Sequence, residues 1–164
     1  MSLLSRTIGR GIAAAALPAV ISATYAHAQP RGAPAVFAAA DFAKLRWLEG
    51  TWVASAPGQS MIYERYRFAN DSTIEITYYS DEGMSREMGT GRIYFAVGRI
   101  FHTFGSRRWG ATRFDDGGLF FAPDGNARST FTWAFSGKDA WTSTLRSGGG
   151  GRESITIYSM KRLR

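Results

Sequence analysis

Apolar and polar residues alternate along most of the chain after Thr51, which is the pattern of half-buried β-strands. About ten short segments show this pattern, and turn-forming clusters of Gly, Asn and Asp separate them. The first segment is at Trp52, and the others read SMIYERYRF, STIEITYYS, GRIYFAV, RIFHTFG, WGATRF, LFFA, STFTWAF, AWTSTLR and ESITIYSMKRL. Their regular spacing predicts an all-β fold, an antiparallel up-and-down barrel of about 8–10 strands.

Alternation also predicts which side chains face the barrel interior. In MIYERYRF two arginines share one phase, which places that phase outside and the other phase inside. The inner phase holds Ile62, Glu64, Tyr66 and Phe68. The same rule gives an inner face to these residues of other segments: Ile74, Ile76, Tyr78, Phe131, Trp133 and Phe135. The predicted interior is therefore aromatic and contains a carboxyl group.

A tight turn at Gly98-Arg99 is predicted to join two of the strands. A two-residue hairpin places the residues that flank it, Val97 and Ile100, on the same face. If Val97 faces inward, alternation puts His102 inside as well. His102 is the only histidine after residue 28, and we expect it to share the barrel lining with Glu64.

Ten inward-facing residues are candidates for contact with a ligand. They are Glu64, Tyr66, Phe68, Tyr78, Phe95, His102, Phe104, Phe131, Trp133 and Trp141. The aromatic members either fill the core or line a cavity for one small molecule. Glu64 needs a partner because an unpaired buried carboxylate is costly, and His102, Arg92 or Arg113 could supply it. Glu64 and His102 are then a structural pair, a polar anchor for a ligand or an acid/base couple.

The first 28 residues have the composition of a secretory signal peptide. Two arginines precede an apolar run at residues 11–23, and Ala26-His27-Ala28 is a small-x-small cleavage site. The apolar run contains Pro18 and is shorter than the roughly 20 residues of a membrane span. We expect cleavage after Ala28 and a periplasmic or secreted protein.

The 136 residues that follow the predicted cleavage site suit a single domain. Residues 29–37 contain two prolines and a glycine and are expected to form a flexible leader. Residues 38–164 are expected to form the barrel domain. At its start, residues 38–48 have apolar side chains at helical spacing, which predicts one short N-terminal helix with Asp41 as its cap.

Charge and cysteine content narrow the classes of function. Without residues 1–28 the chain has eighteen basic and thirteen acidic residues, a net charge of +5. The arginines are scattered instead of forming a stripe, so the charge favours weak contact with anionic surfaces and not nucleic-acid binding. Cysteine is absent, which excludes disulfides, thiolate metal sites and a cysteine nucleophile. No later segment is apolar enough to form a transmembrane helix, and the oligomeric state stays open.

The stretch LRWLEGTW, residues 45–52, follows the predicted helix and leads into the first strand. A short helix, then Leu48-Glu49-Gly50-Thr51-Trp52, then an antiparallel meander resembles the calycin superfamily of lipocalins, fatty-acid-binding proteins and nitrobindin-like domains. The first strand of these proteins carries a Gly-x-Trp signature. The chain is most similar to secreted bacterial lipocalin-like domains of unassigned function that begin with WL-x-GTW. The resemblance covers residues 42–163 in architecture and about five residues in motif.

The resemblance implies a structural role for the motif. Gly50 allows the turn from helix to strand, and Trp52 closes the narrow end of the barrel. In lipocalins a basic residue of the last strand packs across that tryptophan. Arg162 is the expected residue here because a planar guanidinium stacks well on indole, with Lys161 as the alternative one position away.

The resemblance and the motif content argue against a cofactor. Nitrobindin-like members bind haem through a histidine late in the chain, and this sequence has no histidine after His102, so haem is not expected. Catalytic zinc needs about three protein ligands, commonly histidines, so no metal site is expected. The sequence contains no nucleophile elbow, phosphate-binding loop or dinucleotide fingerprint.

Three functions fit these patterns. The leading hypothesis is an exported barrel that binds a small lipophilic molecule between aromatic walls, oriented by Glu64 and His102. The second is an enzyme of isomerase, cyclase or hydrolase type that uses Glu64 and His102 as acid and base, and it ranks below binding. The third is an envelope interaction protein with a filled barrel that acts through its surface.

Overall fold

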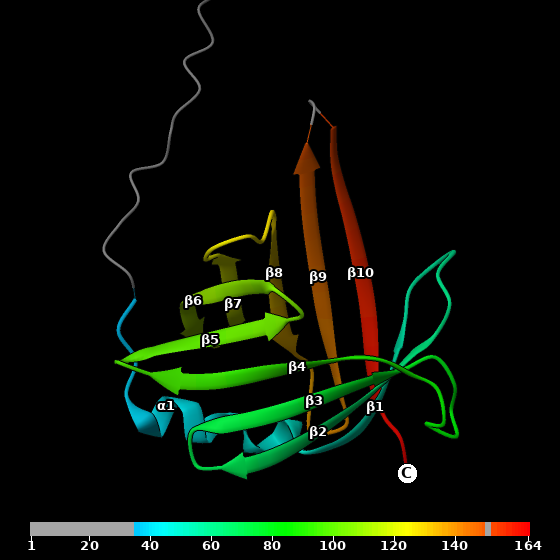
Figure 1. Cartoon of the computed structure of the whole chain (residues 1–164), viewed down its shortest axis with the longest axis horizontal. Coiled ribbons are helices and arrows are strands. Elements are labelled where there is room, and N and C mark those ends of the chain that lie inside the picture. The colour runs from blue at the N-terminus through cyan, green and yellow to red at the C-terminus, as the bar shows by residue number, and fades with distance from the viewer. Residues whose placement is uncertain (1–34, 150–151) are drawn as a thin grey trace, which may run out of the picture. The chain divides into compact units, whose positions relative to one another are not determined.

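Ten antiparallel strands close into a barrel in the computed structural model, which describes residues 35–149 and 152–164. Each strand pairs with its neighbours in the chain, and β10 closes the barrel against β1 (Figure 1). The strands are β1 Gly50–Ser55, β2 Ile62–Asn70, β3 Thr73–Tyr79, β4 Glu87–Ala96, β5 Arg99–Phe104, β6 Arg107–Asp115, β7 Gly118–Pro123, β8 Ser129–Phe135, β9 Ala140–Gly149 and β10 Arg152–Arg162. The prediction of an all-β up-and-down barrel is confirmed.

One short helical segment precedes the barrel. It consists of α1, Ala39–Ala43, followed by the 3-10 turn η1, Lys44–Leu48. Ala38 takes the cap position, and Asp41 is in the first turn. The Oδ2 of Asp41 accepts the N–H of Ala38 at 2.9 Å. The segment starts well inside the chain, so it begins the domain and is not the N-terminus of the protein. Residues 1–34, including the predicted signal peptide, lie outside the described residues.

The helical segment covers one end of the barrel, which we call the helix end (Figure 1). Phe42, Leu45 and Leu48 are completely buried there. The Phe42 ring contacts Phe68 of β2 and Phe95 of β4 at centroid distances of 6.2 and 6.4 Å. The apolar face of the helix therefore plugs the barrel, and the loops at the opposite end are left to form any entrance. Within the described residues, no helix is long and apolar enough to cross a bilayer.

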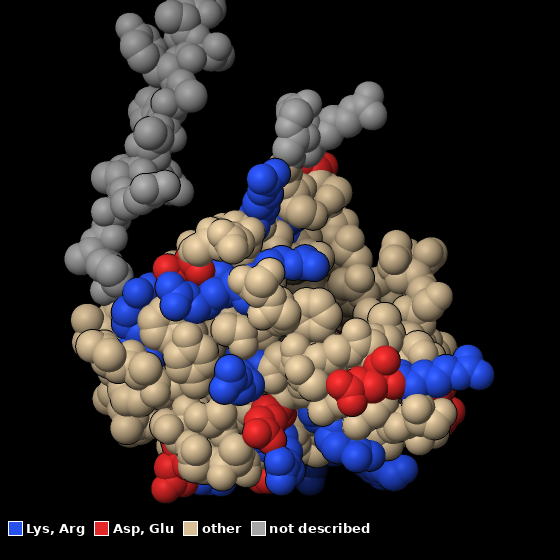
Figure 2. Space-filling model, viewed as in Figure 1, with Lys and Arg blue, Asp and Glu red and all other residues tan. Residues whose placement is uncertain are grey.

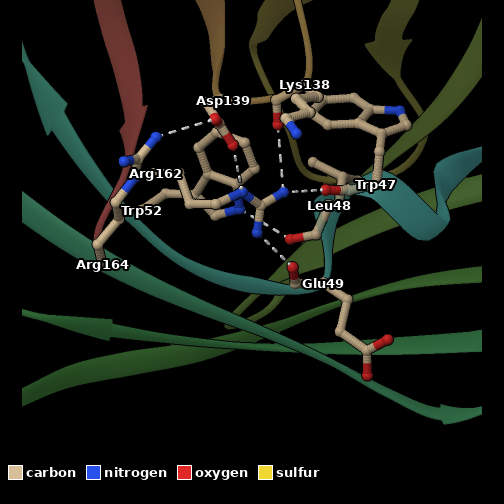
Figure 3. A network of polar contacts seen from close by, with 8 residues as sticks. All are labelled: Trp47, Leu48, Glu49, Trp52, Lys138, Asp139, Arg162 and Arg164. Carbon is tan, nitrogen blue, oxygen red and sulfur yellow. Dashed lines mark hydrogen bonds and ion pairs between the residues drawn. The ribbon is translucent and has the colours of Figure 1, made fainter.

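Arg162 ties the last strand to the helical segment at this end (Figure 3). Its guanidinium lies 4.2 Å from the centroid of the Trp52 ring. Nη1 donates to the carbonyl of Glu49 at 2.7 Å, and Nη2 donates to that of Trp47 at 2.6 Å. Nε donates to a carboxylate oxygen of Asp139 at 3.2 Å. One side chain thus satisfies carbonyl groups that the end of the 3-10 turn leaves without partners.

Gly50 is required for this arrangement. Its φ of +122° lies in a region that favours glycine. A Cβ at this position would also lie only 2.6 Å from Nη1 of Arg162. The absence of a side chain at the helix-to-strand junction is therefore what lets Arg162 reach over Trp52.

The face assignments from alternation hold, but the turn between β4 and β5 differs from the prediction. The turn residues are Val97 and Gly98, both with positive φ, and Val97 is 98% exposed instead of facing inward. The two-residue turn is shifted by one position, so Phe95 pairs with Ile100 and Ile93 pairs with His102. A shift of this kind moves the register by a whole residue pair, and His102 therefore keeps its inward face.

Most charged side chains of the strands lie on the outer faces. Figure 2 shows Lys and Arg spread over one side of the barrel with Asp and Glu between them. Arg67 of β2 and Glu75 of β3 form one such outer pair at 2.5 Å. Pairs of this kind are exposed and contribute little to stability.

The β9–β10 hairpin is only partly built into the barrel wall. β10 pairs with β9 over ten residues, yet it pairs with β1 only at residues 159–162. Residues 152–158 therefore present one backbone edge that no strand of the described chain covers. Figure 1 shows the hairpin rising above the rest of the barrel.

Candidate functional site

A cavity of about 300 Å³ lies inside the barrel. Eight of the ten sequence-predicted residues line it: Glu64, Tyr66, Tyr78, His102, Phe104, Phe131, Trp133 and Trp141. Met88 and Arg107 also line it and are exposed, so the cavity reaches the surface at the end opposite the helix. The barrel brings side chains from eight of its strands to this one space.

Phe68 and Phe95 lie outside the cavity. Both face inward, as alternation predicts, but they are at the helix end and pack against Phe42. Alternation specifies the face of a strand and not the depth along the barrel axis. These two rings therefore belong to the plug beneath the helix.

Several lining residues were not among the sequence candidates. They are Ile62, Met88, Arg107, Trp109, Ser129, Ser143, Leu145, Tyr158 and Met160. Most share an alternation phase with a residue already placed inside: Ser143 and Leu145 follow Trp141 on β9. Extending the same rule along β6, β9 and β10 would have found them.

The floor of the cavity is a cluster of aromatic rings. Trp141 lies 5.1 Å from Trp133 and 6.4 Å from Tyr66, measured between ring centroids. On its other side Trp141 contacts Trp52 at 6.0 Å. The helix half of the barrel is thus filled with side chains, and the opposite half is hollow.

Glu64 projects from β2 into the hollow half, opposite Tyr78 of β3. The hydroxyl of Tyr66 donates to its Oε2 at 2.5 Å. Burial raises the pKa of Glu64 from 4.5 to about 7, and the hydrogen bond from Tyr66 only partly offsets this. No cation of the described residues contributes to that pKa.

The partners that the sequence suggested for Glu64 do not contact it. Arg113 is on the outer face of β6, where it pairs with Asp115 at 2.9 Å and stacks on Phe120. Arg92 is exposed on the outer face of β4. An arginine on an outward phase cannot cross the sheet, so Tyr66, a neighbour on the same face of β2, takes the role instead.

His102 lies among aromatic rings and is only 6% exposed. Phe131 and Trp133 are within 5.2 and 5.6 Å of its ring centroid. Its Nε2 lies 3.5 Å from the hydroxyl of Tyr78. Burial lowers the pKa of His102 to about 3, so the ring is neutral at physiological pH. His102 makes no hydrogen bond to Glu64 in the described structure, and Tyr78 is the residue that neighbours both.

Two polar atoms of the cavity lining are buried without a partner among the described residues. They are Nδ1 of His102 and Nε1 of Trp141. A buried polar group without a hydrogen bond costs about 1–3 kcal/mol. Both residues line the cavity, but neither atom is itself exposed to it, so each lies within the aromatic wall.

A shallow polar depression adjoins the cavity entrance. Arg107 and Ser129 belong to both, and Arg128, Ser147 and Ser154 line the depression. Arg107 and Arg128 are exposed and make no ion pair within the described residues. The entrance therefore carries positive charge, whereas Glu64 is the one acidic side chain among the described residues that line the cavity.

No group of three His, Asp or Glu side chains in the described ranges is arranged to hold a metal ion. Comparison with family models and with curated proteins gave no match. The closed ten-stranded antiparallel barrel is consistent with the calycin resemblance of the sequence.

Proposed function

We propose that the protein binds a small lipophilic molecule inside the barrel. The aromatic walls supply affinity, and Glu64 and His102 orient the ligand. The observation that carries the proposal is the coincidence of a hollow, aromatic-lined half-barrel with the carboxyl of Glu64 in its wall, which receives one hydrogen bond only from the described residues. Binding sites for small molecules are typically apolar cavities with a few polar groups that fix orientation.

The size of the cavity limits the ligand. Its volume of about 300 Å³ is at the lower end of the range of small-molecule sites. A compact molecule of roughly ten to twenty heavy atoms fits this space better than a long-chain lipid.

The proposal places this binding outside the cytoplasm. This location is inferred from the first 28 residues, whose basic, apolar and small-x-small segments match an export signal. Molecules of the envelope or the surroundings are then the accessible ligands.

Binding is favoured over acid/base catalysis by Glu64 with His102. The two groups share no hydrogen bond, and a histidine with a pKa of about 3 is a poor proton donor near neutral pH. The pKa of Glu64, about 7, would suit proton transfer by that residue alone. We therefore treat Glu64 first as a ligand contact.

Filling the cavity tests the proposal. Ser143→Phe adds a ring to the cavity wall, whereas Thr144→Phe adds the same ring to the outer face of the same strand. Protein from the native envelope or medium, and protein incubated with a mixed lipid extract, is analysed by native mass spectrometry.

We expect a bound small molecule on the wild type and on Thr144→Phe, and at least tenfold less on Ser143→Phe. Circular dichroism verifies that both variants are folded. Equal occupancy of the two variants would place binding outside the cavity, and an unoccupied wild type under both conditions would refute the proposal.

A further inference from the structure

The interior of the barrel contains a carboxyl group that has no cation beside it. Glu64 receives one hydrogen bond, from Tyr66, and the remaining acceptor positions of its two oxygens have no donor in the described residues. The carboxylates that do form ion pairs in the described structure lie on the outer surface or at the barrel ends, as Glu75, Asp115 and Asp139 do. Glu64 is thus a partly buried acceptor in a cavity lined by aromatic rings.

We propose that the ligand is a lipophilic amine whose ammonium group pairs with Glu64. This rests on the proposed function and adds the chemical class of the ligand. The ammonium donates to the free acceptor positions of the carboxylate, and the hydrocarbon body occupies the aromatic part of the cavity. Binding supplies the positive charge that the folded chain leaves out of this site.

The surrounding rings favour a cation over a neutral donor. Tyr66 and Tyr78 flank Glu64, and Trp133 and Trp141 form the floor beside them. The face of an aromatic ring carries negative electrostatic potential and attracts an organic ammonium, most strongly when water is excluded. A hydroxyl could also donate to Glu64, but it would gain neither the charge pairing nor the attraction to the rings.

The positive entrance does not reverse this preference. Arg107 and Arg128 are exposed, and solvent with salt screens their fields beyond about 8 Å at physiological ionic strength. Glu64 lies in the interior, where screening is much weaker. The arginines therefore slow the entry of a cation, while Glu64 determines its affinity at equilibrium.

Three compounds with one skeleton test the inference. 3-Phenylpropylamine, 3-phenylpropanol and 3-phenylpropionate differ only in the polar group, and each is small enough for the cavity. Their dissociation constants are measured at pH 8 by titration calorimetry and by the intrinsic tryptophan fluorescence of the protein, since Trp109, Trp133 and Trp141 line the cavity. We expect the amine to bind at least tenfold more tightly than the alcohol, and the carboxylate to bind most weakly.

Glu64→Gln removes the charge and keeps an acceptor for Tyr66, and Glu75→Gln is the matched control on the outer face of β3. We expect Glu64→Gln to lose the tenfold preference for the amine while it binds the alcohol as the wild type does. Glu75→Gln should leave all three affinities unchanged.

Two kinds of result would overturn the inference. One is a carboxylate or alcohol that binds as tightly as the amine, and the other is an amine preference that survives in Glu64→Gln. If these compounds fail to bind while the lipid extract supplies a ligand, the amine inference fails and the binding proposal stands. If the wild type binds neither, both fail.

Discussion

At the scale of single residues, Glu64 and His102 set the response of the protein to pH. The pKa of Glu64 is raised, so the folded state keeps its proton longer than the unfolded chain does, and stability falls as the pH rises from 4.5 to 7. The pKa of His102 is lowered to about 3, so stability also falls as the pH drops from 6.5 to 3. Between pH 4.5 and 6.5 the two effects oppose each other.

Replacing Glu64 should remove its contribution to the pH dependence of stability. Glu64→Gln removes the cost of ionising a buried carboxyl, so at pH 8 it should unfold with a free energy higher than that of the wild type by up to about 3 kcal/mol. The difference should shrink towards zero by pH 4. Urea unfolding at several pH values measures it.

Glu75→Gln is again the control, because its exposed pair with Arg67 contributes about 1 kcal/mol at most. Parallel stability curves for Glu64→Gln and the wild type from pH 4 to pH 8 would contradict a carboxyl buried without a cation.

At the scale of elements, the short helical segment depends on the last strand. The 3-10 turn η1 is five residues long and has no side-chain cap hydrogen bond. A helical segment this short is unstable alone, so its position comes from buried side chains and from Arg162. The contacts of Arg162 span more than a hundred residues of sequence, from Trp47 and Glu49 to β10.

Replacing Arg162 should lower the free energy of unfolding far more than replacing the neighbouring Arg164. Arg162→Met keeps an unbranched side chain over Trp52 but leaves the carbonyls of Trp47 and Glu49 without their donors, so we expect a loss of about 2–4 kcal/mol in the free energy of unfolding. Arg164→Met is the control, because Arg164 is 87% exposed and shares only Asp139 with the network. Equal losses for the two variants in urea unfolding would show that Arg162 is a surface charge and nothing more.

The free edge of β10 makes a prediction for hydrogen exchange. Within residues 154–158, successive amides point alternately to β9 and to the uncovered side. We expect alternate amides in this stretch to exchange at least a hundredfold faster than their neighbours, as measured by NMR in deuterated buffer. Uniform protection that increases with protein concentration would instead indicate that another chain pairs with this edge.

At the scale of the whole molecule, local alternation was enough to predict the barrel and the inward face of Glu64 and His102. Moving the two-residue turn by one position, as at Val97, changes the partner of Ile100 by two residues, from Val97 to Phe95. Two residues are one full period of a strand, so the predicted face of His102 was still correct. The depth along the axis depends on the tilt and stagger of all ten strands, and no single segment encodes it. For this reason the positions of Phe68 and Phe95 beneath the helix could not be predicted from their own strands.

The partner of Glu64 was within reach of the sequence. Tyr66 is two residues away on the same face, and side chains at this spacing are neighbours along a strand. The sequence-based prediction considered His102, Arg92 and Arg113 as partners of the carboxyl and did not consider the hydroxyl of Tyr66. The hollow half of the barrel is a different case, because its existence depends on packing between strands that are far apart in the chain.

The indoles of the barrel have an optical consequence. Trp47, Trp52, Trp141 and Trp133 form a connected series, with each ring centroid 5.1 to 6.0 Å from the next. Chromophores this close mix their excited states, because the coupling between transition dipoles grows with the inverse cube of their separation. The far-ultraviolet circular dichroism should therefore contain a paired positive and negative band from tryptophan in addition to the β-sheet signal. Since Trp133 and Trp141 also form the cavity floor, the protein carries a built-in chromophore that reports any change in their mutual angle.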